Sequence, residues 1–188
     1  MVITKLEGNT IKLFEWLETK MFKTNPSKSH LILSSNDTGK ALVLNGIIIP
    51  NEHQVELLGI TFDNGLDFDI HVTRLCKQAS RKLQALFRIS NYMDMNKRRL
   101  LMNSFFISQF SYCPLIWMFH SRTLNNRINR LHERCLRIVY SDFSSSFEQL
   151  LSKDESFTIH ERNIQNLAIE LFKVKMGLAP IFLKEIFI

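Results

Sequence analysis

The spacing of apolar residues predicts that the chain begins with an amphipathic helix. Apolar side chains recur at intervals of three and four residues from Leu6 to Met21, so a helix is expected over about Thr4–Phe22. Pro26 then disfavours helix at the residue before it, which predicts a turn. Weak alternation over His30–Ser34 is typical of a strand.

Two apolar runs around Asn45-Gly46 give the strongest local signal. Ala41–Leu44 and Ile47–Ile49 predict a hairpin, because the two central residues of a type I′ turn need positive φ and Asn-Gly provides it. Val55–Phe62 is expected to be the next strand. Gly59 within it leaves room for another backbone or a ligand to approach. We interpret this segment as the hinge between a small sheet and a helical part.

After the hinge the pattern changes to helical periodicity. Helices are expected over Asp69–Ile89, from Asp94 to just before Pro114, and over Ser121–Val139, Phe147–Ser152 and Thr158–Met176. Gly177 and Pro180 are typical of a helix end. The residues expected to be buried include Phe87, the apolar cluster Tyr112, Leu115, Ile116, Trp117 and Phe119, and the stripe Ile164, Leu167, Ala168, Leu171 and Val174. The fold class is therefore α+β, a small antiparallel sheet with one helix followed by a mainly α-helical bundle.

The charge is concentrated in the middle of the chain. The formal net charge of the 188 residues is +6, but the stretch from His71 to Tyr140 holds 13 Lys and Arg residues and only 2 acidic ones. Clustered cations gain affinity for nucleic acid by releasing counterions from phosphates. A basic helical surface that is merely solvated is the alternative reading.

Composition excludes several classes of protein. No apolar run reaches the length of a membrane span, and the N-terminus lacks signal-peptide features, so we expect an intracellular protein, nuclear or cytoplasmic, that is not secreted and has no membrane partner. Cys76, Cys113 and Cys135 form no ligand motif, so reduced thiols and no metal site are expected. The histidines have no neighbours that suggest a catalytic triad. Asp63, Asp67 and Asp69 do not follow the pattern of a calcium loop, so turn and capping roles explain them.

Several segments in collinear order resemble the reverse transcriptases of non-LTR retrotransposons, in the jockey-like group. Trp16–Leu33, with its Asn25-Pro-Ser-Lys28 turn, is similar to the segment after the catalytic aspartates of that family. Leu57–Asp63 resembles its primer-grip strand. The thumb and the region after it are represented by Phe110–Trp117, Leu131–Val139, Ile159–Asn163 and Phe172–Pro180. The resemblance covers essentially the whole chain.

The resemblance implies the C-terminal part of such an enzyme. Residues 1–63 would be a palm remnant with the primer grip, 64–140 a helical thumb, and 141–188 a post-thumb helical region. The family carries out RNA-directed DNA synthesis with two Mg²⁺ ions held by aspartates, and this sequence has no Asp-Asp pair. We therefore expect a truncated fragment that binds a template–primer duplex but has no cofactor and no polymerase activity of its own.

The resemblance also suggests functional residues. Lys28 matches a lysine that would assist pyrophosphate release, an auxiliary catalytic role only in a complete enzyme. Leu58, Gly59 and Ile60 match the primer grip. The basic helices would follow the phosphates of an RNA–DNA or DNA duplex without sequence specificity. The expected contacts are Arg74, Lys77, Arg81, Lys97, Arg98 and Arg99, with Arg127, Arg130 and Arg134 as a second group.

Three alternatives remain open from the sequence. The chain could be a helical protein- or nucleic-acid-interaction module with no polymerase role, whose partner is the absent palm and fingers or a second copy of itself. It could also be an active polymerase that obtains its carboxylates elsewhere. Finally, it could be a transposon relic with no cellular role.

Overall fold

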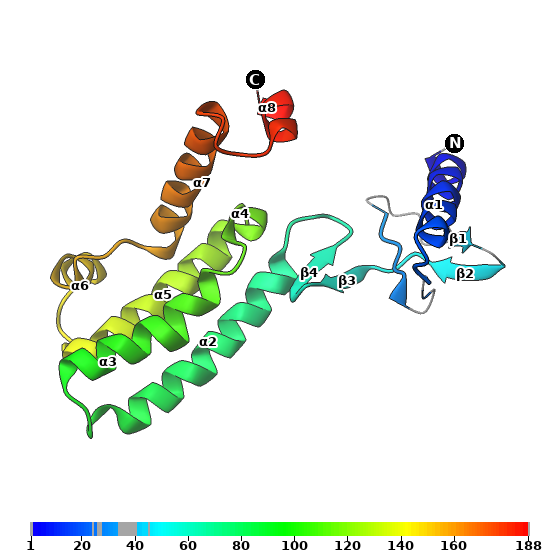
Figure 1. Cartoon of the computed structure of the whole chain (residues 1–188). Coiled ribbons are helices and arrows are strands. Elements are labelled where there is room, and N and C mark those ends of the chain that lie inside the picture. Colours follow the sequence, from blue (N-terminus) through cyan, green and yellow to red (C-terminus); the bar gives the residue numbers. More distant parts are fainter. Residues whose placement is uncertain (1, 24, 26–27, 34–40, 45, 188) are drawn as a thin grey trace. The chain divides into compact units, whose positions relative to one another are not determined.

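A computed structural model describes residues 2–23, 25, 28–33, 41–44 and 46–187 (Figure 1). The chain divides into two compact units, Met1–Phe68 and Asp69–Ile188. The first contains a helix and two antiparallel hairpins, and the second is helical. This arrangement confirms the α+β class. The functional identity of residues 1–63, 64–140 and 141–188 stays a prediction.

The first unit is built around the hairpin that Asn45-Gly46 predicted. Strands β1 (Ala41–Leu44) and β2 (Ile47–Pro50) pair antiparallel, with Leu42 opposite Ile49. Gly46 has a φ of 79°, and Asn45 lies outside the described residues. Helix α1 (Val2–Thr19) packs on this hairpin, so that Leu6 and Phe14 contact a small core of Leu31, Leu42 and Ile49. A strand was expected over residues 30–34, of which the structure describes residues 30–33. Leu31 instead forms a single β-bridge to Asn51.

The segment expected to be one strand is a second hairpin, so that prediction was wrong. Strands β3 (Gln54–Leu57) and β4 (Ile60–Asp63) pair antiparallel, and Leu58-Gly59 forms the turn between them. The φ angles of Leu58 and Gly59 are 49° and 82°, which is the left-handed conformation of a type I′ turn. Leucine adopts this conformation at a cost, so the sequence signal was weak.

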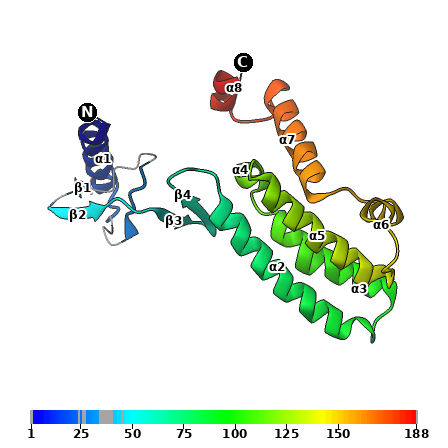
Figure 2. The ribbon, with the colours of Figure 1, turned by 180° about the vertical axis from the view of Figure 1, so that it is seen from behind.

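Within the described residues 69–187, nine helical segments make up the second unit (Figures 1 and 2). They are α2 (Asp69–Ser90), α3 (Met95–Leu101), the π-helical turn η2 (Met102–Phe106), the 3₁₀ turn η3 (Ile107–Phe110), α4 (Pro114–Trp117), α5 (Arg122–Tyr140), α6 (Phe147–Asp154), α7 (Ile159–Lys175) and α8 (Ile181–Phe187). Helices α2 and α5 lie side by side, and α3 with η2 packs against both. The core between them contains Val72, Cys76, Ala79, Leu83, Leu86, Phe106, Trp117, Ile128, Cys135 and Leu136.

Local capping signals set the helix ends as expected. The Asp94 carboxylate accepts a hydrogen bond from the Lys97 backbone N–H at the start of α3. Thr158 and Glu161 form a capping box at the start of α7. At the other end of α7, the N–H of Leu178 donates to the Lys173 carbonyl beyond a left-handed Gly177, which is a Schellman motif.

Some residues expected to be buried are exposed. Phe87 is 59% exposed on α2. Of the apolar cluster around α4, Tyr112, Ile116 and Phe119 are exposed, Leu115 is half-buried and Trp117 is buried. On α7, Ile164 and Leu171 are exposed and Val174 is buried. Periodicity identifies the apolar face of a helix, but burial requires a neighbour. Helix α7 packs mainly against α4, α5 and α8, which leave much of that face open.

All three cysteines are free thiols, as expected. Within the described ranges, no helix has both the length and the apolar character needed to cross a membrane.

Candidate nucleic-acid interface

Helix α2 carries four of its five cations along one face, with Lys82 outside that face. Arg74, Lys77, Arg81 and Arg88 follow one another at intervals of three, four and seven residues, which places them within about 80° of one another around the helix axis. Lys77, Arg81 and Arg88 are exposed, and Arg74 is half-buried. With a rise of about 1.5 Å per residue, the row is about 21 Å long. The buried residues of α2 face the core instead.

Helix α5 has a matching basic face. Arg127, Arg130, Arg134 and Arg137 are also spaced by three or four residues, so they share a sector of about 80°. The first three are exposed and Arg137 is half-buried. Arg137 forms an ion pair with Glu133, one turn earlier, at 2.7 Å.

The two basic faces come together at one end of the contact between α2 and α5. Arg88 from α2 and Arg134 and Arg137 from α5 line the same pocket. Nearer the start of the two helices, burial raises the pKa of the Cys76 thiol on α2. The positive charge of Arg127 on α5 has a smaller, opposite effect and lowers this pKa. Arg127 therefore lies close to α2 as well. Arg74 and Lys77 line a separate pocket beside α2, and Arg127 and Arg130 line another beside α5. We call the surface of α2 and α5 that carries these eight cations, with the shared pocket at one end, the α2–α5 groove.

Arg98 binds other parts of the protein. One guanidinium nitrogen donates hydrogen bonds to the Ile138 carbonyl at 2.9 Å and to the Ser141 hydroxyl at 2.5 Å. Both acceptors lie at the C-terminal end of α5, where a cation also complements the helix dipole. Arg98 thus joins α3 to the end of α5.

Arg99, whose side chain is 46% exposed, forms an ion pair with a buried carboxylate. Its Nε lies 2.9 Å from the carboxylate of Asp154, whose side chain is 3% exposed, and another of its nitrogens donates to the Asp154 carbonyl at 2.6 Å. The Tyr140 hydroxyl donates to the same carboxylate at 2.7 Å. Burial and this hydrogen bond raise the pKa of Tyr140 to about 12. Arg99 therefore connects α3 to α5 and α6.

Lys97 completes the basic triplet at the start of α3. Its ammonium lies 3.0 Å from the Asp94 carboxylate, and both side chains are largely exposed. Cations in a first helical turn oppose the helix dipole. The intramolecular acceptors of Lys97, Arg98 and Arg99 account for the triplet, and phosphate contact by these three residues stays an untested prediction.

The residues suggested by the primer-grip resemblance form the second hairpin turn. Leu58 and Gly59 are its two central residues, and the Leu58 side chain is 80% exposed. Ile60 begins β4 and is buried. Lys28 is exposed, and its backbone N–H donates to the Asn25 carbonyl. The predicted roles of these four residues stay untested.

Asp63 has the turn role that was expected of the small carboxylate cluster. It is buried at the end of β4 and accepts hydrogen bonds from the backbone N–H groups of Asp67 and Phe68. Across the part of the chain that the structure describes, no group of three or more His, Cys, Asp or Glu residues could hold a metal ion.

Sequence reasoning missed two arginines of the groove. Arg88 and Arg137 were not among the expected contacts, although each continues the spacing of the cations before it on its helix. The sequence had placed both on the basic faces of their helices, but not among the preferred phosphate contacts. That the two faces meet could not be read from the sequence, because it depends on how the helices pack.

One curated protein is similar to most of this chain. It is "Probable RNA-directed DNA polymerase from transposon BS" of Drosophila melanogaster, 26% identical over 134 residues. These residues cover 68% of this chain but only 15% of the Drosophila protein. No family model matches the chain, and no solved structure matches it. The similarity supports the conclusion that this protein contains a region related to the RNA-directed DNA polymerases of transposons.

Proposed function

We propose that the α2–α5 groove binds the phosphate backbones of a nucleic-acid duplex, as the template–primer-binding part of a reverse transcriptase. The observation that carries this proposal is the convergence of two basic helix faces, at the point where Arg88, Arg134 and Arg137 line one pocket. Regularly spaced cations along a groove suit the regularly spaced charges of a duplex.

The charge balance of the groove favours a polyanion. Two acidic residues of α2 and α5, Asp69 and Glu133, accompany the eight cations, and Glu133 forms an ion pair with Arg137. Helix faces that contact phosphates read no base sequence, so binding should be nonspecific and sensitive to salt. The similarity to a transposon polymerase makes an RNA–DNA hybrid the first duplex to test.

Fluorescence anisotropy of a labelled, blunt RNA–DNA duplex at several salt concentrations tests the proposal. If about six phosphates are neutralised, the logarithm of the binding constant should fall with the logarithm of salt concentration at a slope of about −5. Replacing Lys77 and Arg81 by Ala should weaken binding and reduce the steepness of that slope by about 2.

The matched control is the double variant with Lys12 and Lys20 of the first unit replaced by Ala. These lysines are exposed, and the control removes the same charge from outside α2 and α5. Equal losses of affinity in the two double variants would mean that net charge alone drives binding. Absence of duplex binding by the unaltered chain at low salt would refute the proposed function.

We also propose that the chain binds a primer–template without extending it, because its sequence has no Asp-Asp pair to bridge two metal ions. Primer extension with purified protein and Mg²⁺ is the test. Incorporation above that of a mock preparation would contradict this part of the proposal.

A further inference from the structure

The pocket where the two basic faces meet has an apolar floor and aromatic walls. Its volume is about 370 Å³, which lies within the range of about 300–1,000 Å³ typical of small-molecule sites. Leu83 and Ile138 are its buried apolar residues. Phe87 and Phe143 line it as well, and both are more than half exposed. A surface that binds phosphates alone needs no such aromatic lining.

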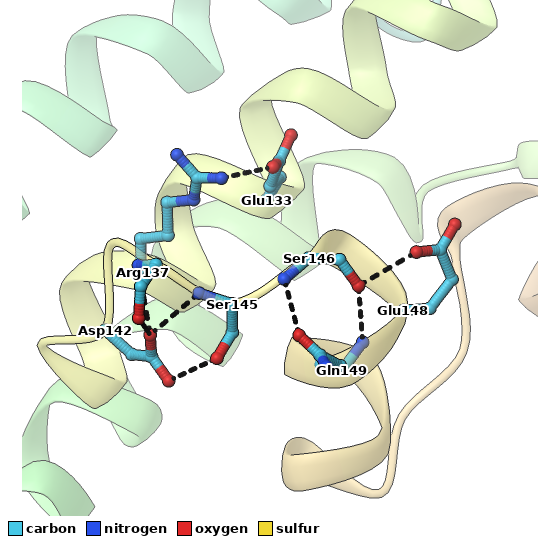
Figure 3. A network of polar contacts seen from close by, with 8 residues as sticks. Glu133, Arg137, Asp142, Ser145, Ser146, Glu148 and Gln149 are labelled. Atoms are coloured by element: carbon cyan, nitrogen blue, oxygen red, sulfur yellow. Dashed lines mark hydrogen bonds and ion pairs between the residues drawn. The ribbon is translucent and has the colours of Figure 1, made fainter.

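The loop that carries Phe143 is held in place by hydrogen bonds. The Asp142 carboxylate accepts from the backbone N–H groups of Ser144 and Ser145 and from both of their hydroxyls (Figure 3). These hydrogen bonds, the Ser145 hydroxyl first, hold the pKa of Asp142 well below its usual range. The next residue, Ser146, forms a capping box with Gln149 at the start of α6. The loop therefore presents Phe143 from a fixed backbone.

The polar lining of the pocket is cationic. The side chains of Arg88 and Arg134 form no ion pair or hydrogen bond with any other residue in the described part of the chain. Arg137 is partly neutralised by Glu133, as Figure 3 shows. The other nearby carboxylate, Asp142, is bound to the serines and to Lys153 at 3.3 Å. Two arginines thus remain available for an anion, beside the exposed amide of Gln84.

We infer that this pocket binds one unpaired nucleotide, with its base stacked on Phe143 and its phosphate bound by Arg88 and Arg134. Stacking on aromatic side chains beside a positively charged groove is how proteins bind single-stranded nucleic acid. An apolar peptide would leave the two arginines without partners, whereas a nucleotide satisfies both the rings and the charges. The inference rests on the proposed function, because it places the end of a duplex strand at one end of the same groove.

The test compares three RNA–DNA duplexes by anisotropy. One is blunt, one carries three unpaired nucleotides on one strand, and one carries three abasic residues with the same phosphates. The last two duplexes carry the same charge, so a difference in affinity between them measures base stacking. The unaltered chain should bind the duplex with bases about 5- to 150-fold more tightly than the abasic duplex, the range for one stacked base.

Phe143→Ala should abolish most of this preference while leaving affinity for the blunt duplex unchanged. The matched control is Tyr92→Ala, which removes an 88% exposed aromatic ring that does not line the pocket, and it should keep the preference. Both side chains are exposed, so neither change should alter the fold. The inference is overturned if the unaltered chain does not distinguish bases from abasic residues, or if Phe143→Ala keeps the full preference.

A second arm separates failure of the inference from failure of the proposed function. Binding of the blunt duplex without a preference for bases would refute the pocket and leave the proposed function standing. If no duplex binds, a calorimetric titration with AMP tests the pocket directly. Binding of AMP that Phe143→Ala removes would support a nucleotide site that takes free nucleotides. Absence of that binding would overturn the inference.

Discussion

His132 lies buried in an environment that disfavours its charged form. It is fully buried on α5, its ring stacks on Phe106 at 5.6 Å between centroids, and it meets the edge of Phe147 at the same distance. Neither ring nitrogen has a hydrogen-bond partner among the described residues. Burial, reinforced by the positive charge of Arg162, lowers the pKa of His132 from its ordinary value of 6.5 to about 4, against a smaller opposing effect of Asp154. Protonation of this ring should therefore destabilise the second unit.

The size and sign of the effect follow from linkage. Between about pH 6.5 and pH 4 the unfolded chain binds a proton that the folded chain does not, so the free energy of unfolding falls as pH falls through this window. At about 1.4 kcal/mol for each tenfold change in proton affinity, the full loss is about 3 kcal/mol. About 2 kcal/mol of it should be lost between pH 7 and pH 5.

Urea denaturation of the wild-type chain and of His132→Leu at a series of pH values measures this contribution. Trp16→Phe in both proteins leaves the buried Trp117 as the only tryptophan, so fluorescence reports on the second unit. His120, whose pKa is also lowered by burial, is present in both and cancels in the difference. The difference in unfolding free energy should shift by about 2 kcal/mol in favour of the variant between pH 7 and pH 5. Equal pH dependence of the two proteins would refute the reasoning.

Two further substitutions test assignments made from the geometry. Arg99→Ala should lower the unfolding free energy of the second unit by about 2–3 kcal/mol, because it leaves the buried Asp154 carboxylate without its cation. Urea denaturation measures this loss, with Arg81→Ala as the control. A loss no larger than that of the control would contradict the structural role of Arg99. Leu58→Asn should stabilise the second hairpin by about 0.5–1 kcal/mol, because asparagine adopts the left-handed conformation more readily than leucine. An unchanged or lower thermal midpoint of the first unit would show that the turn is not strained.

Several local features could be predicted because neighbouring residues determine them. Asn45-Gly46 predicted the first hairpin since the required φ angles are a property of those two residues. Asp94 and Thr158 predicted helix starts because a capping side chain reaches only the N–H groups of its own first turn. The turn at Leu58 was missed because leucine rarely adopts positive φ.

The candidate interface was predicted in part. The basic faces of α2 and α5 follow from helical spacing, and so did the choice of Lys77, Arg81, Arg127 and Arg130. The intramolecular acceptor of Arg99 lies 55 residues away in the sequence, so no local pattern could have indicated it. The exposure of Phe87 likewise depends on what packs against its side of α2.

By itself, the sequence determined the long helices α1, α2, α5 and α7, the short helix α6, the start of α3, the first hairpin and the concentration of positive charge between His71 and Tyr140, but not α4 or α8. Each of these depends on interactions within a few residues or on composition. Only the tertiary structure decided which cations border the α2–α5 groove and which hold the fold together, and which aromatic residues line the pocket. The physical reason is that partners distant in the sequence determine whether a side chain is paired, buried or left exposed for a ligand.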